Sequence, residues 1–252
     1  MKWARIEVGG RAFRAELRGA QLVDDRGNSF SPSEAKFLPP VIPPNFYAAG
    51  LNYRAHIEWA NKHHGTNHKP PEQADIGYRS NNALIGSGAD IVIPRDSKGP
   101  VEFEGELVAV IGREGRNLGE DKVLDHVAGY TLGNDVSERS WQRSDRTLWR
   151  AKNSDSFKPM GPCVVSGIDP MDQVIEVRIN GRTVSSYNTK GMLFSVAHYL
   201  SRMSRYVTLH PADVVWFGCD GATVPALQPG DLVEVVNEAI GILANRVTRA
   251  AE

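Results

Sequence analysis

The chain has 252 residues and a formal net charge of −1, with 29 Lys and Arg against 30 Asp and Glu. That length can bury a full core, and the balanced charge lacks the basic excess by which proteins bind nucleic acid or anionic membranes non-specifically. No window reaches the ~20 apolar residues of a membrane span, and the N-terminus lacks the apolar run of a signal peptide. We therefore expect a cytoplasmic protein that binds neither nucleic acid nor membrane.

Residues 1–44 are predicted to form a small β domain. Short alternating apolar and polar runs are separated there by turn signals such as residues 24–28. Four prolines between residues 39 and 44 exclude a helix and stiffen the segment as an extended connector. We place the domain boundary there, so that residues 45–252 form the second domain.

The second domain is predicted to be mainly β with a few short helices, an α+β arrangement. Asn180-Gly181 predicts a tight hairpin turn, and residues 192–203 have apolar residues at helical spacing. A short helix is expected to carry His56, and the polar, turn-rich residues 64–78 are expected to form a lid. The predicted strands are 46–51, 91–94, 107–112, 174–179, 182–184, 214–217 and 232–236.

The most informative residues are Glu102, Glu104 and Glu106, which alternate directly before the apolar run 107–111. On a strand they share one face, where like carboxylates repel and lose solvation. Protonation, basic partners, open water or a cation must offset this cost. Asp135 forms a second polar island after a strand-like segment. Converging carboxylates suit Mg²⁺ or Mn²⁺, and the plain alternative is a solvated strand face.

Five segments resemble, in order, the fumarylacetoacetate hydrolase family over roughly residues 46–248. Each alone is common, whereas the ordered set is specific. The segments are Gly50-Leu51-Asn52-Tyr53-Arg54-Ala55-His56; Glu104-Gly105-Glu106-Leu107; Gly129-Tyr130-Thr131 with Asn134-Asp135-Val136-Ser137-Glu138-Arg139; Lys152 with Pro159-Met160-Gly161-Pro162; and Gln228-Pro229-Gly230-Asp231 with Gly241-Ile242-Leu243-Ala244-Asn245.

The resemblance implies a mixed β-sandwich roll, a homodimer and a Mg²⁺ or Mn²⁺ site, with Ca²⁺ as a further candidate. Matching the family's motifs residue by residue implies that Glu104, Glu106 and Asp135 bind the metal. Glu102 has no counterpart among those motifs. We expect it to be a solvated group or a support outside the ligand set.

The resemblance also assigns the catalytic and substrate-binding positions. It implies a divalent-metal-dependent hydrolase that cleaves a carbon–carbon bond in an acylpyruvate-like or other 1,3-dioxo acid, in the catabolism of aromatic compounds. The steps would be a metal-chelated enolate and attack by a water that His56 activates, with Lys152 polarising the substrate. The residues expected to hold the substrate are Tyr53, Arg79, Arg139, Gln142 and Thr223.

The acid that usually assists the family's His is missing from its expected position. Trp59 stands three residues after His56, where a Glu is expected. Glu58 is one residue early and would point about 100° away on a helix, so Glu72 in the predicted lid is the other candidate.

Two further positions depart from the family. Arg79 replaces a Lys and offers a flat fork that suits a carboxylate. The usual Gly-Thr-Pro turn reads Gly218-Cys219-Asp220, so Thr223 would have to supply the hydroxyl.

These departures leave other functions open. The same metal site could serve decarboxylation, isomerisation (tautomerisation) or dehydration of an oxo-acid, which need no activated water and which Trp59 favours. A degenerate member that binds a ligand without turnover is a third hypothesis, against which the retained charged residues argue.

Overall fold

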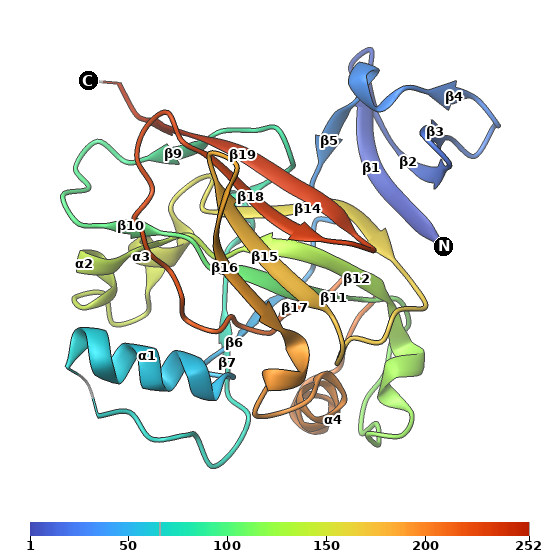
Figure 1. The fold of residues 1–252 in the computed structure, drawn as a ribbon. Coiled ribbons are helices and arrows are strands. Elements are labelled where there is room, and N and C mark those ends of the chain that lie inside the picture. The colour runs from blue at the N-terminus through green and yellow to red at the C-terminus, as the bar shows by residue number, and fades with distance from the viewer. Residues whose placement is uncertain (66, 252) are drawn as a thin grey trace.

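The computed structural model describes residues 1–65 and 67–251. Thr66 in the predicted lid, Glu252 and the side chain of His64 lie outside the described residues. The protein is mainly β, as predicted: two sheets pack together, and helices lie along one side (Figure 1). Among the described residues, no helix is both long and apolar enough to cross a membrane.

The strands are β1 (Lys2–Val8), β2 (Arg11–Arg18), β3 (Gln21–Val23), β4 (Ser29–Phe30), β5 (Lys36–Leu38), β6 (Phe46–Ala49), β7 (Ile76–Tyr78), β8 (Leu84–Ile85), β9 (Ile91–Ile93), β10 (Val101–Glu102), β11 (Gly105–Ile111), β12 (Val127–Asn134), β13 (Ser137–Glu138), β14 (Lys158–Val165), β15 (Val174–Ile179), β16 (Arg182–Asn188), β17 (Val214–Trp216), β18 (Leu232–Asn237) and β19 (Gly241–Arg249). The α-helices are α1 (Arg54–His64), α2 (Arg139–Gln142), α3 (Trp149–Asn153) and α4 (Val196–Tyr206). Short 3-10 helices span Pro32–Glu34, Asn81–Ala83, Val123–His126 and Thr189–Gly191.

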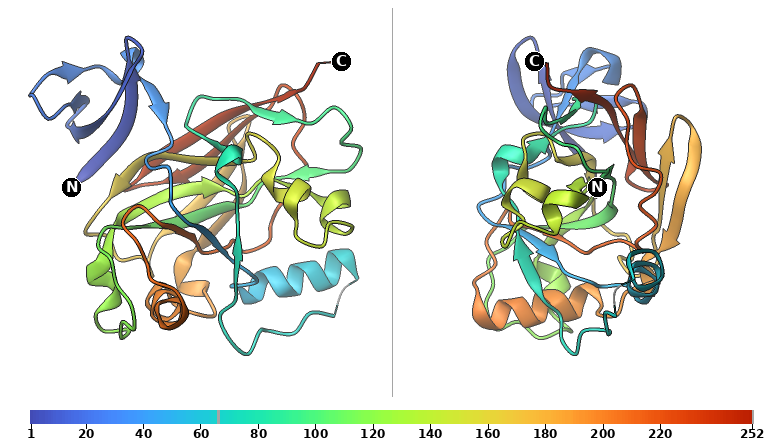
Figure 2. Two further views of the ribbon diagram at one scale, coloured as in Figure 1. Left: turned by 180° about the vertical axis from the view of Figure 1, so that it is seen from behind. Right: turned by 90° about the vertical axis from the view of Figure 1, so that its left-hand side faces the viewer.

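The two large sheets enclose the main core. One runs in the order β4-β3-β2-β1-β14-β12-β11-β17-β6-β7, and the other in the order β16-β15-β18-β19-β9 (Figures 1 and 2). Leu107 and Leu132 of the first sheet pack in one buried cluster with Val177 and Val233 of the second. Each such side chain contributes about 1.5–3 kcal/mol when fully buried. The rigid sheet sandwich is the scaffold on which the site is built.

The N-terminal strands β1–β5 close on a small cluster of their own, which includes Ala4, Ile6 and Leu22. They stand at one corner of the molecule, beside the main sandwich (Figure 1). β1 also pairs antiparallel with β14, with Trp3 opposite Val164. The main sheet therefore continues into the N-terminal strands, and the boundary at residue 44 stays a prediction.

The predicted hairpin at Asn180-Gly181 is confirmed. β15 and β16 pair on either side of it, and both turn residues have positive φ, 52° and 77°. This is the backbone that a two-residue type I′ turn requires.

The helix predicted over residues 192–203 is wrong at both ends, since α4 spans Val196–Tyr206. Asn52 draws the preceding residues out of the helix: its side-chain oxygen accepts from the Phe194 N–H at 3.0 Å. The Ser195 side chain then caps α4. Apolar spacing alone could not locate a start that a distant asparagine fixes.

Candidate metal and active site

Glu104, Glu106 and Asp135 meet at one end of strands β11 and β12. Each offers a carboxylate oxygen, and these atoms lie within 4.8 Å of one another. The antiparallel register sets Gly105 opposite Asn134, and the Asp135 N–H donates to the Glu104 carbonyl at 2.8 Å. Strand pairing therefore brings together side chains that are far apart in the sequence.

Gly105 explains the direction in which the two glutamates point. A Cβ at this position would lie 2.6 Å from a methyl carbon of Val177 and 3.1 Å from one of Val235, closer than carbon atoms approach. Residue 105 therefore faces the second sheet. Because neighbouring residues of extended chain face opposite ways, Glu104 and Glu106 point away from that sheet.

The expected row of three glutamates on one strand is wrong. β10 ends at Glu102 and pairs with β13, whereas β11 begins only at Gly105. Glu102 is also not solvated: it is 5% exposed and accepts from Arg139 Nε at 2.7 Å and from the Thr223 hydroxyl. Glu102 therefore binds Arg139, which in turn binds Glu104 of the acidic trio.

Three cationic side chains surround the Asp135 carboxylate. Arg79 donates to both oxygens, at 3.2 and 2.7 Å, Lys152 Nζ lies 3.0 Å from Oδ2, and Lys158 Nζ lies 2.7 Å from Oδ1. Burial raises the pKa of Asp135, but the three cations outweigh burial and hold that pKa well below its usual range. Arg79 was expected to bind the substrate, but its guanidinium binds Asp135 instead.

Lys158 is a member of this cluster that the sequence analysis missed. It is fully buried and donates to the carbonyls of Val136 and Phe157 at 3.0 and 2.8 Å. Burial lowers the pKa of Lys158 to about 7, against the opposing effect of Asp135. The available signal for a buried lysine was its place at the start of the otherwise apolar segment that forms β14.

Glu104 is held by two cations. Lys152 Nζ lies 2.7 Å from Oε2 and Arg139 Nη2 lies 2.8 Å from Oε1. Burial raises the pKa of Glu104, but Lys152 and then Arg139 outweigh it and lower that pKa to about 2. Glu104 is therefore ionised.

Glu106 has no such partner. It is 3% exposed, it accepts from the Gly218 N–H at 2.8 Å, and within the described part of the chain no Lys or Arg forms an ion pair with it. Burial, with Asp135 and Glu104 nearby, raises the pKa of Glu106 well above its usual range. A divalent cation would relieve this repulsion through three hard oxygen ligands, so the three residues fit Mg²⁺ or Mn²⁺.

His56 is fixed by the loop that follows β17. Its Nδ1 lies 3.2 Å from the Cys219 carbonyl, which can only accept, so Nδ1 carries the proton and Nε2 of the neutral ring is an acceptor. Gly221 packs on the imidazole, since a Cβ there would lie 2.7 Å from Cγ and Cδ2. Burial lowers the pKa of His56, reinforced by Arg139 and opposed by Glu104.

The same loop organises the acidic residues. Gly218 donates to Glu106, and the Thr223 hydroxyl, expected at the substrate, donates to Glu102 instead. One segment therefore positions His56 and supports the carboxylates, a role that the sequence analysis did not foresee.

Neither proposed helper acid reaches His56. Glu58 and Glu72 are exposed, and in the described residues neither forms a hydrogen bond with the imidazole. Glu58 lies two residues after His56 on α1, and side chains two residues apart on a helix point about 200° away from each other, so Glu58 faces away from the imidazole. Tyr53, another expected substrate contact, is 2% exposed, with its ring packed edge-on against Tyr187 at 5.2 Å.

A cavity of about 450 Å³ opens beside His56 and Arg139. Gln142, expected to hold the substrate, bonds to Arg139: its Oε1 accepts from Arg139 Nη1 at 2.6 Å. Arg139 in turn reaches Glu104, so the cavity adjoins the acidic trio. The lining residues are Leu51, His56, Trp59, Ala60, His68, Arg139, Gln142 and Arg143.

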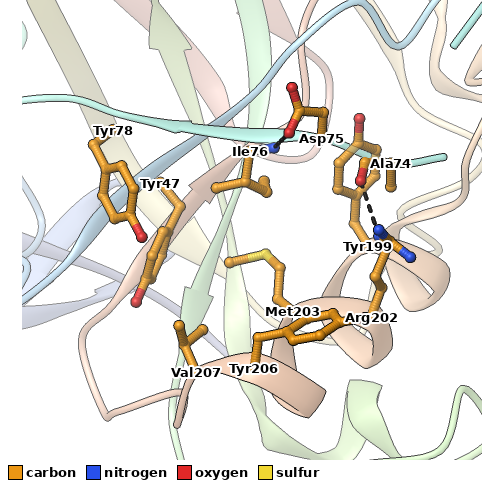
Figure 3. A pocket seen from close by; sticks show the side chains of 10 residues that line it. All are labelled: Tyr47, Ala74, Asp75, Ile76, Tyr78, Tyr199, Arg202, Met203, Tyr206 and Val207. Atoms are coloured by element: carbon orange, nitrogen blue, oxygen red, sulfur yellow. Dashed lines mark hydrogen bonds between the residues drawn. The ribbon is translucent and has the colours of Figure 1, made fainter.

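A second cavity, of about 200 Å³, lies between α4 and the β6–β7 strands (Figure 3). Tyr47, Tyr78, Tyr199 and Tyr206 contribute to its wall, and at one edge of it Arg202 donates to the Ala74 carbonyl at 3.0 Å. Its lining contains no member of the acidic trio and no His56, so it is a separate feature.

Comparisons with known proteins identify the family of the chain. The family model described as fumarylacetoacetate (FAA) hydrolase, C-terminal, matches residues 45–248. An uncharacterized protein of Archaeoglobus fulgidus is 37% identical over 247 residues, 97% of this chain and 95% of that protein. The mitochondrial oxaloacetate tautomerase Fahd2a of Rattus norvegicus is 32% identical over 226 residues, 85% of this chain and 70% of that protein.

Among solved structures, 5-carboxymethyl-2-hydroxymuconate delta-isomerase from Mycobacterium smegmatis superposes with a TM-score of 0.89 at 31% identity, over 100% of both chains. The resemblance inferred from the ordered motifs is therefore confirmed. The chain belongs to the fumarylacetoacetate hydrolase family.

Proposed function

We propose that the protein is a divalent-metal-dependent isomerase that interconverts the keto and enol forms of a 2-oxo acid. The observation that carries the proposal is the setting of His56. Its Nδ1 is held by a backbone carbonyl, burial lowers its pKa although nearby Glu104 opposes this, and no Asp or Glu among the described residues forms a hydrogen bond with its ring. Such an imidazole is a neutral base for a carbon acid, whereas activation of water in this family relies on a paired acid.

Two relatives support this class of reaction. The rat protein is named an oxaloacetate tautomerase, and the mycobacterial structure is named a delta-isomerase of a 2-hydroxymuconate. Both names describe movement of a proton and a double bond without loss of carbon.

Glu104, Glu106 and Asp135 would hold the cation, which when bound supplies a Lewis acid that polarises the substrate's oxo group. Lys152 and Arg139 keep Glu104 ionised and add fixed positive charge near the oxygen on which negative charge develops. These charges need no reorganisation during the reaction, because buried ion pairs already fix them.

The chemical step moves one proton. His56 Nε2 takes a proton from the carbon next to the oxo group, the C–H electron pair becomes the C=C bond, and the oxo oxygen gains the carbonyl electron pair. The imidazolium then returns the proton to that oxygen. Atoms and charges balance, and no water is consumed.

Hydrolysis of a carbon–carbon bond, the function first expected, is the competing outcome of the same test. It requires a water activated by His56 with an assisting acid, for which Glu58 and Glu72 are the candidates. A hydrolase would consume acylpyruvates and release two acids.

The test is an enol-absorbance assay of oxaloacetate and an acylpyruvate, run with Mg²⁺, with Mn²⁺ and with EDTA. We expect metal-dependent acceleration of tautomerisation, loss of that acceleration in EDTA and in His56→Ala, and no new carboxylic acid product. Appearance of cleavage products instead would establish the hydrolase.

The pH profile tests the base. A base must be unprotonated, so kcat/KM falls as pH falls through the pKa of His56. Because burial lowers that pKa, the acid limb should lie below the ordinary imidazole value of about 6.5. An acid limb above that value would contradict a neutral, depressed His56.

A further inference from the structure

The outer wall of the cavity beside His56 differs from the charged centre, and it has a flat apolar side. Trp59 lies one helical turn after His56 on α1, so both side chains share one face of the helix. Leu51 and Ala60 line the same cavity. A 2-oxo acid bound at the charged centre would therefore extend its distal part over these residues.

The indole of Trp59 is held in a defined orientation. Its ring stacks on His63 at 4.5 Å with an interplanar angle of 20°. A fixed aromatic plane favours another flat π system, because offset-stacked rings gain energy beyond their buried area.

His68, which follows α1, gives the cavity a further wall. His68 lines it, and the backbone of His68 pairs with the side chain of Asn61 on α1, with bonds of 2.7 and 2.9 Å. The polar side is formed by His56, His68, Arg139, Gln142 and Arg143. Arg139 donates both to Gln142 and to Glu104 of the acidic trio. The apolar side of the lining is formed by Leu51, Trp59 and Ala60, and the indole of Trp59 is its flat member.

The size of the cavity excludes a tight fit for the smallest substrates. Its volume of about 450 Å³ lies in the range of sites that enclose whole drug-sized ligands, roughly 300–1,000 Å³. A four-carbon oxo-acid would leave Trp59 in contact with water.

We infer that Trp59 determines specificity, and that the preferred substrates are 2-oxo acids whose distal part is a flat aromatic or conjugated group stacked on this indole. The inference rests on the proposed function for the reaction but concerns the substrate's tail. It gives a physical role to the residue that stands where the family's helper acid is expected.

The experiment compares three enolisable probes: phenylpyruvate with a flat tail, 4-methyl-2-oxopentanoate with a branched saturated tail, and oxaloacetate with a short polar tail. Wild-type protein should give the highest kcat/KM with phenylpyruvate. Trp59→Leu should lower the phenylpyruvate-to-oxaloacetate ratio of kcat/KM roughly tenfold, and Trp59→Phe should restore most of it. Trp149→Leu, at an exposed tryptophan that lines a different cavity, should leave the ratio unchanged.

Binding to the Mn²⁺-loaded protein, measured by calorimetry, separates this inference from the proposed function. Phenylpyruvate that binds in a Trp59-dependent manner without turnover would retain the inference and overturn the proposed reaction. Equal losses for all three probes in Trp59→Leu, or equal preference for the branched tail, would overturn the inference while the isomerase stands. Absence of both binding and turnover would overturn both.

Discussion

The charged centre, formed by Glu104, Glu106, Asp135 and their cationic partners, differs from the outer wall of the cavity around Trp59, although Arg139 belongs to both. In the centre, Glu104 and Asp135 each have two or more cationic partners within 3.2 Å. Both carboxylates and both lysines are buried, and the two arginines are partly buried. On the wall, Trp59 is only half-buried, and Glu58, its neighbour on α1, is exposed and does not line the cavity. Buried charges must be paired or they destabilise the fold, whereas a half-exposed wall tolerates change. Substitutions in the charged centre should therefore reduce stability and turnover more than substitutions on the cavity wall, which should mainly change the choice of substrate.

The largest expected effect comes from breaking the centre at Asp135→Ala. Fully buried Lys158 would lose its carboxylate, and removal of one partner of a buried pair costs about 3–5 kcal/mol. We expect that loss in the free energy of unfolding, measured with urea in EDTA, together with loss of Mn²⁺ binding by calorimetry.

The matched control for Asp135→Ala is the double variant Asp135→Ala/Lys158→Met. Replacing the stranded lysine by an apolar side chain should recover part of the stability but none of the Mn²⁺ binding. If Asp135→Ala proved as stable as wild type, or still bound Mn²⁺, the centre would not be the interdependent cluster described here.

A smaller effect is expected at Gly221→Ala, where the loop joins the centre to the wall. The added Cβ would collide with the His56 ring, so kcat should fall at least tenfold while Mn²⁺ binding is retained. Gly230→Ala is the control, since Gly230 also has positive φ (99°) but no atom within 4 Å of the new Cβ. Both variants should lose roughly 1–2 kcal/mol of stability from backbone strain; equal activity in both would show that His56 does not depend on Gly221.

The smallest effect is expected at Glu58→Gln on the exposed side of α1. A surface substitution of this kind changes stability by less than about 0.5 kcal/mol. Because Glu58 does not contact His56, turnover of oxaloacetate should stay within twofold of wild type. A large loss of acylpyruvate cleavage would instead restore Glu58 as the helper acid.

The sequence was most informative about residues whose spacing has one structural meaning. Asn180-Gly181 is a hairpin turn because few residues accept the required φ values. The ordered motifs then identified the family, and with it Asp135 as the third member of a trio that the fold does bring together.

The sequence was least informative about partners. Arg79 and Thr223 were expected at the substrate, yet they bond Asp135 and Glu102. Lys158 was missed because an isolated lysine in an apolar strand gives no indication of the carboxylate that will face it. Which side chains pair depends on the register of the sheet and on the path of the loops, and neither can be predicted from the residues of one short segment.

By itself, the amino-acid sequence determined the mainly β class, the hairpin, the family and the acidic residues, because periodicity, turn chemistry and motif order are properties of the chain in one dimension. Only the tertiary structure decided that Glu106 has no Lys or Arg ion-pair partner among the described residues, that the His56 ring bonds to the Cys219 carbonyl, and that Trp59 lines the cavity. Those facts arise where segments distant in sequence exclude water together, and burial is what turns a neighbour's charge or carbonyl into a shift of pKa.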